Sequence, residues 1–122
     1  MGQFWPGRPS ARDAVDLHQL TEEMNRFVAD KGWYPPDSRA PQTPRNIAAS
    51  LSIEAAEVLE HFQWTEAPRH TEELPGELAD VALYLLQLAY LSGIDLEQAI
   101  LDKLTVNYAR SWPDDEPPPT HP

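Results

Sequence analysis

Two pairs of acidic residues lie three positions apart in the most apolar parts of this sequence. Glu54 and Glu57 form the first pair, and Glu77 and Asp80 form the second. On a helix, positions i and i+3 share a face, so each pair directs its two carboxylates the same way. Burying four carboxylates without neutralising them would cost several kcal/mol each. We therefore expect a positive charge to lie among them.

The sequence offers few side chains that could supply this charge. Lys31 and Lys103 are its only lysines, and its arginines lie outside the two acidic stretches or at their ends. A hard divalent cation is the simpler solution, because Mg²⁺ and Mn²⁺ both suit a site made of carboxylates. One acidic pair alone is typical of a solvated helix face. Two pairs on consecutive apolar helices favour a metal site instead.

The composition limits the possible partners. The chain has 122 residues, the size of one domain, and a formal net charge of −11. This charge argues against nonspecific binding to nucleic acid or anionic lipid, because both require a basic surface. The absence of cysteine excludes disulfides, zinc–thiolate sites and thiol catalysis. Without a recognisable signal sequence or a long apolar run, we expect a cytoplasmic protein with no membrane or nucleic-acid partner.

Apolar residues recur at helical spacing in four stretches, and no stretch shows a strand pattern. The predicted helices span residues 11–30, 44–62 and 75–92, and a fourth begins near residue 96. Their predicted caps are Ser10, Thr43 and Asp95 at N-termini and Gly93 at a C-terminus. Four helices with short links predict an all-α protein, an antiparallel four-helix bundle.

One domain is predicted over residues 1–113, beginning with an irregular arm over residues 1–9. Residues 114–122 are acidic and rich in proline, so we expect a disordered tail. The third predicted helix is apolar nearly all round, which predicts an obligate oligomer. The fourth predicted helix carries an apolar stripe that we expect to be buried: Leu96, Ala99, Ile100, Leu104 and Tyr108.

Three histidines could in principle join a metal site. His18 is expected at the surface or its boundary, and His70 has no ligand partner at a useful spacing. His61 stands four residues after Glu57, and we favour a boundary position for it over a ligand role.

The acidic pairs and their neighbours together resemble a known family. The pattern is Ile-Glu-Ala-Ala-Glu-Val-Leu-Glu-His-Phe-Gln-Trp over residues 53–64, Glu-Leu-Ala-Asp-Val over residues 77–81, Ile-Asp-Leu over residues 94–96, and Lys103, Asn107 and Arg110. It is similar to the MazG-like all-α nucleoside triphosphate pyrophosphohydrolases, and within them to the dCTP-pyrophosphatase-like branch. The resemblance implies hydrolysis of a (deoxy)nucleoside triphosphate to the monophosphate and pyrophosphate, with Mg²⁺ on the four acids. It also implies a homodimer or a dimer of dimers (a homotetramer), with sites assembled between subunits.

The same resemblance implies roles for single residues. Glu54, Glu57, Glu77 and Asp80 match the catalytic metal ligands. Lys103, Asn107 and Arg110 match residues on the phosphate side, while Trp33 and Trp64 match aromatic positions near the base. The sequence departs from the family pattern in the length of the loop that begins at Trp33 and in the segment after Arg110. Both departures leave the preferred base open.

Other classes of protein explain the sequence less well. A di-iron carboxylate bundle would need Glu-x-x-His pairs, which this sequence lacks. A non-catalytic helical oligomerisation or binding module remains the alternative, although it would need no inward-facing acids. For an enzyme, the expected substrate is dCTP or a related or non-standard pyrimidine nucleotide, and the expected purpose is sanitation of the nucleotide pool.

Overall fold

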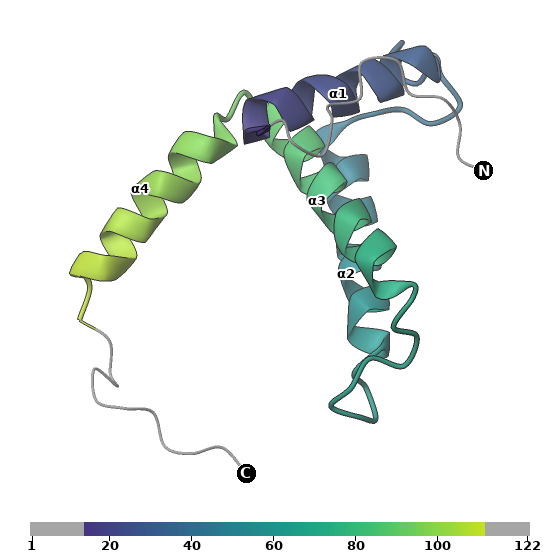
Figure 1. Ribbon diagram of the computed structural model, residues 1–122. Coiled ribbons are helices and arrows are strands. Elements are labelled where there is room, and N and C mark those ends of the chain that lie inside the picture. Colours follow the sequence, from purple (N-terminus) through teal and green to yellow (C-terminus); the bar gives the residue numbers. More distant parts are fainter. Residues whose placement is uncertain (1–13, 112–122) are drawn as a thin grey trace.

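The computed structural model describes residues 14–111, and these residues form four helices and no strand. In chain order the helices are α1 (Leu17–Asp30), α2 (Pro44–Glu60), α3 (Leu74–Leu91) and α4 (Leu96–Ala109), as Figure 1 shows. The predicted all-α class is therefore confirmed. The expected arm over residues 1–9 and the expected tail over residues 114–122 lie outside the described residues.

Three helix ends follow the local signals in the sequence. The Thr43 hydroxyl caps α2 by accepting a hydrogen bond from the Asn46 N–H at 3.2 Å. The Asp95 carboxylate caps α4 by accepting from the Gln98 N–H at 3.1 Å. Gly93 follows α3 with a φ of +69°, the left-handed conformation that ends many helices. These three caps are as predicted.

Two predicted helix ends are wrong. α1 begins directly after Asp16, whose carboxylate accepts a hydrogen bond from the Gln19 N–H at 2.8 Å. The Gln19 side chain accepts a bond in return from the Asp16 N–H at 2.9 Å, which completes a capping box. The earlier start that Ser10 suggested is therefore incorrect, and Ser10 itself lies outside the described residues. α2 ends at Glu60 rather than at Phe62.

The helices pack in two layers around a small core. α2 lies alongside α3, and α1 crosses the end of this pair (Figure 1). Met24 and Val28 of α1 are buried against Leu86 of α3. The partly buried residues packed around these three are Leu17, Tyr34 and Leu96. The core therefore joins α1 to α3, whereas the acidic part of α2 lies outside it.

α4 projects away from the other three helices and is bent by 101° from α3 (Figure 1). The stripe that we expected to be buried is not buried in the single chain, because no residue of α4 is buried and Tyr108 is 89% exposed. The sequence pattern identifies an apolar face, but the direction of the helix decides whether anything covers it. Large apolar side chains are also exposed on α3: Leu78, Leu83, Leu85 and Tyr90.

Among residues 14–111, no single helix is long and apolar enough to cross a membrane. α3 and α4 reach the required length and composition only when taken together as a bent pair.

Substitutions of two glycines test where α3 begins and ends, because Gly76 lies in its first turn and Gly93 lies just beyond its last residue. Gly93→Ala should lower the free energy of unfolding by about 1–2 kcal/mol, because a Cβ is strained at its positive φ. Gly76→Ala should raise it by about 0.4–1 kcal/mol, because an added Cβ there would meet open space and the unfolded chain would lose freedom. Urea unfolding at one fixed protein concentration measures both changes. Effects of the same sign would contradict this assignment of the α3 ends.

Candidate metal centre

The two acidic pairs converge between α2 and α3. Glu54 and Glu57 are half-buried on α2, and Glu77 is half-buried in the first turn of α3. Burial raises the pKa of the Glu54 carboxyl, and a hydrogen bond with Glu57 raises it further. The remaining causes are the nearby negative charges of Glu57, Asp80 and Glu77. The two helices thus bring all four predicted acids into one electrostatic group.

The chemistry of this acidic group fits a hard divalent cation. All four donors are carboxylate oxygens, which such cations prefer. No three of the four acids offer oxygen atoms that all lie within 4.8 Å of one another, so no three of them, as they lie, could ligate the same ion. Two carboxylates on one ion would leave its other coordination positions to water and phosphate oxygens.

His61 is the residue that sequence reasoning placed wrongly. Its side chain is only 4% exposed, so it is buried rather than at a boundary. Its Nε2 lies 2.5 Å from Oε2 of Glu77, one of the four acids. The connector between α2 and α3 folds back over the ring, which helical periodicity cannot reveal. The Glu57–His61 spacing drew attention to this histidine, but not to its partner.

A large cavity adjoins Asp80, one of the four acids. Its volume is about 1210 Å³, and it lies between α1, the loop that follows α1, α2 and α3. Asp80 forms part of its wall, and Trp33 lines it from the loop. The Trp33 ring packs edge-on against Phe27, with 5.7 Å between ring centroids. Trp33 therefore stands in the same cavity as one of the acids.

The cavity also has a polar wall that sequence reasoning missed. Gln87 is only 3% exposed, and its Nε2 donates a hydrogen bond to Oε1 of Gln42 at 2.6 Å. Tyr34 does not line the cavity but lies beside Gln87, and it donates its hydroxyl hydrogen to Oδ1 of Asn25. Burial and the nearby Tyr90 raise the pKa of Tyr34, whereas the hydrogen bond with Gln87 opposes this rise. In the sequence, Gln87 is only a polar interruption of the mostly apolar run over residues 78–91.

The remaining predicted site residues lie apart from the acids in a single chain. Lys103 and Asn107 belong to α4 and Arg110 follows it, while α4 meets the rest of the chain chiefly at α1. Trp64, in the connector after α2, is 81% exposed and does not line the large cavity. One chain therefore brings together the four acids and Trp33, but neither the phosphate-side residues nor Trp64.

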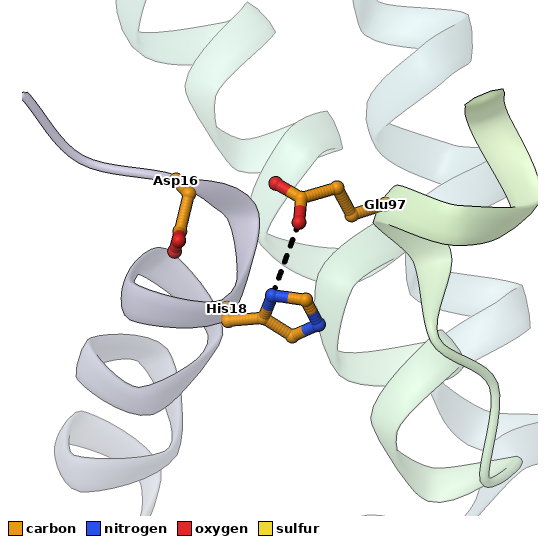
Figure 2. Close-up of side chains that lie close together, drawn as sticks. All are labelled: Asp16, His18 and Glu97. Atoms are coloured by element: carbon orange, nitrogen blue, oxygen red, sulfur yellow. Dashed lines mark ion pairs between the residues drawn. The ribbon is translucent and has the colours of Figure 1, made fainter.

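A second group could geometrically hold a cation, where α1 meets α4. Figure 2 shows Asp16, His18 and Glu97. Each offers a ligand atom within 4.8 Å of the others. His18 Nδ1 lies 3.2 Å from Glu97 Oε2, and its Nε2 lies 3.1 Å from Asp95 Oδ1. Asp16 and Asp95 already serve as helix N-caps, and His18 is exposed. We interpret this group as a surface ion pair between two helix starts, consistent with the surface position expected for His18.

Replacing one acid separates a metal site from a structural role. In metal-free protein, Glu54→Gln or Asp80→Asn should be at least as stable as the parent, because each removes one of several repelling charges. Mg²⁺ should raise the melting temperature of the parent by mass action, and raise it less in these variants. Glu60→Gln is the matched control, because Glu60 is exposed and not among the charges that act on Glu54. A metal-free loss of about 3–5 kcal/mol would instead indicate a paired structural carboxylate.

The raised pKa of Glu54 also predicts a pH dependence. A carboxyl with a higher pKa in the folded state binds more protons when folded, so stability falls as the pH rises through its titration range. Glu54→Gln removes this loss. In metal-free protein, Glu54→Gln should therefore be no more stable than the parent below about pH 4.5, the ordinary pKa of this carboxyl. Its gain in stability over the parent should grow as the pH rises above that value. Thermal melts of both proteins at a series of pH values measure this difference.

The amino-acid sequence is similar to a family of known proteins and to several of its individual relatives. The model of the MazG-like family matches residues 49–116. Human dCTP pyrophosphatase 1 is 32% identical over 114 residues, which cover 86% of this chain and 64% of the human protein. A dATP/dGTP diphosphohydrolase from Cyanophage S-2L is 53% identical over 38 residues, covering 31% of this chain and 36% of that protein. The chain thus spans less than two thirds of the length of these relatives.

A solved structure is similar along most of its length. The crystal structure of a pyrophosphatase from Archaeoglobus fulgidus superposes with a TM-score of 0.63 at 32% sequence identity. The match covers 81% of this chain and 94% of the archaeal chain. The similarity in fold and the match of the family model therefore agree.

Proposed function

This chain belongs to the MazG-like family, and on that premise we propose that it hydrolyses a nucleoside triphosphate to the monophosphate and pyrophosphate. The observation that carries this proposal is the convergence of four carboxylates beside a large, partly apolar cavity. The carboxylates would hold the cation, and the cavity would receive the base. Similarity to proteins named as dCTP pyrophosphatase and as pyrophosphatase supports the same reaction.

Electrostatics explains why the reaction needs a metal. The protein has a formal net charge of −11, and a triphosphate is also strongly negative. Mg²⁺, with Mn²⁺ as a substitute, would neutralise phosphate oxygens and lower the pKa of a bound water. The four acids would hold and orient this cation. With no more than two of these carboxylates on one ion, the cation would keep positions for water and substrate.

The cavity suits a nucleobase in shape and chemistry. Trp33 and Phe27 supply aromatic surface for stacking, and both line the cavity. Gln42, Asn46 and Gln87 supply amide groups that could hydrogen-bond to the edge of a base. Asp80 stands in the same wall. A base in this cavity would therefore place the phosphates toward the acidic group.

The residues on the phosphate side would come from a second copy of the chain. Lys103, Asn107 and Arg110 are carried by α4 and its end, which project away from the acids of the same chain (Figure 1). The exposed apolar side chains of α3 and α4 give a second copy a surface to cover. We therefore propose a homodimer or a dimer of dimers with shared sites. Trp64, exposed in the single chain, would join the base side of such a site.

A deoxynucleoside triphosphate is the proposed substrate class, with dCTP or a related or non-standard pyrimidine nucleotide first. Similarity to dCTP pyrophosphatase 1 over most of the chain supports a pyrimidine. Because a shorter segment is similar to a dATP/dGTP diphosphohydrolase, purine deoxynucleotides should also be assayed. Sanitation of the nucleotide pool is the proposed purpose, and the cytoplasm remains the proposed location.

A nucleotide panel tests the reaction. With Mg²⁺, at least one deoxynucleoside triphosphate should give the monophosphate and pyrophosphate, and excess chelator should abolish turnover because the acids then repel the substrate. Ion-exchange chromatography identifies both products. Turnover that persists in chelator would sink the metal mechanism. A diphosphate and orthophosphate as products would mean a different bond is cleaved, and no turnover on any nucleotide would favour a non-catalytic helical module.

Mixing two inactive variants tests the shared site. Glu54→Gln removes a proposed metal ligand, and Lys103→Ala removes a proposed phosphate contact. If each site combines acids of one chain with Lys103 of another, equal mixing of the variants should restore about a quarter of the parent activity, because half of the dimers then carry one intact site. The activity is measured after unfolding the mixture and refolding it. A mixture as inactive as its components would show that each site lies within one chain.

A further inference from the structure

The buried ring of His61 uses both of its nitrogens. Nε2 lies 2.5 Å from Oε2 of Glu77, and Nδ1 lies 3.3 Å from the backbone nitrogen of His70. The ring is only 4% exposed, and it packs in a T-shaped arrangement with the His70 ring, with 6.2 Å between centroids. Water is therefore largely kept from competing for either bond. The two bonds join the end of α2, the connector and the start of α3.

The partners of His61 define which nitrogen carries the proton. A backbone N–H can only donate, so Nδ1 must accept the bond from His70 and carries no proton. In a neutral imidazole the other nitrogen then carries the hydrogen, and Nε2 donates to the Glu77 carboxylate. This arrangement leaves His61 no lone pair for a metal ion. It fixes one oxygen of Glu77 and leaves the other carboxylate oxygen for other contacts.

The backbone around His61 holds this ring in place. His61 is the C-cap residue of α2, and its carbonyl oxygen accepts a hydrogen bond from the Arg69 N–H at 3.0 Å. The connector is thus tied to His61 through both backbone and side chain. A ring fixed in this way can hold the Glu77 side chain, which is 24% exposed, in one orientation.

We propose that His61 is a positioning residue that orients the Glu77 carboxylate for cation binding; this inference rests on the proposed metal site. Carboxylates that bind metals are commonly held by such hydrogen bonds, and losing the outer partner typically lowers metal affinity about 10–100-fold. His61 acts through Glu77 and contacts neither the cation nor the substrate.

Two substitutions separate the two bonds of the ring. The amide nitrogen of glutamine reaches the position of Nε2, so His61→Gln can still donate to Glu77 but loses the acceptor for the His70 N–H. The amide oxygen of asparagine matches Nδ1, so His61→Asn keeps that acceptor and loses the donor to Glu77. One variant therefore keeps the bond to the acid, and the other keeps the bond to the connector.

Titration calorimetry with Mn²⁺, in the absence of nucleotide, should show affinity lowered about 10–100-fold in His61→Asn and close to the parent value in His61→Gln. Thermal melts of the metal-free proteins should show the reverse order, with His61→Gln the less stable variant. Equal Mn²⁺ affinity in the parent and His61→Asn would overturn the proposal. So would an equal loss in both variants, which would indicate a ligand or a merely structural role.

A measurement on the unaltered chain keeps the proposal testable if a variant fails to fold. Long-range ¹H–¹⁵N NMR spectra distinguish the two neutral tautomers of histidine. The parent should show a protonated Nε2 and an unprotonated Nδ1 for His61, both before and after Mg²⁺ is added. A protonated Nδ1 would overturn the proposal, because the bond from the His70 N–H could not then form.

Failure of this inference can be told apart from failure of the proposed reaction. A parent chain that binds Mn²⁺ but hydrolyses no nucleotide contradicts the proposed reaction, while the two variants still decide the role of His61. A parent chain that hydrolyses nucleotide, with a His61→Asn variant that binds Mn²⁺ equally well, contradicts only the positioning role.

Discussion

Repulsion among four carboxylates between α2 and α3 is the constraint on which this structure depends. Burial and its neighbour Glu57 on the same helix raise the pKa of Glu54, and packing α2 against α3 adds the negative charges of Asp80 and Glu77. Like charges at short range oppose the packing that brings them together. Contacts elsewhere must therefore hold the two helices together in the absence of a cation, and binding a cation would convert the repulsion into attraction.

Few of the side chains that make such contacts are buried in a single chain. Among the described residues, the buried apolar side chains are Met24, Val28, Ile47, Leu86 and Ala89. The core joins α1 to α3, and the bond from His61 to Glu77 links the far end of α2 to the start of α3. Meanwhile the apolar faces of α3 and α4 are exposed. A second copy that covered these faces would add the burial that one core of this size lacks.

The features predictable from sequence are those set by neighbouring residues. Thr43 and Asp95 cap helices through bonds that reach only three residues along the chain. The i, i+3 spacing of the acids likewise fixes their shared face on each helix. The start of α1 was misjudged because Ser10 and Asp16 are both suitable caps, and only the capping box with Gln19 distinguishes them.

The features that the sequence could not predict depend on the path of the chain. His61 meets Glu77 across 16 positions because the connector folds back, and no periodic pattern records this. Gln87 pairs with Gln42 across 45 positions for the same reason. The direction of α4 follows from a four-residue turn, so an apolar stripe was recognisable while its exposure was not.

The cavity wall shows how one scaffold could serve relatives named for different bases. Stacking against Trp33 and Phe27 favours any base, because every base has an aromatic face. Discrimination must come from groups with fixed donors and acceptors. Gln42 is such a group, because its Oε1 accepts from Gln87 and its Nε2 donates to the Ala40 carbonyl at 2.5 Å. Its amide is thus oriented before any ligand arrives. Since the loop that carries Gln42 also departs in length from the family pattern that the sequence resembles, we expect the proposed base preference to be the property most free to differ in this chain.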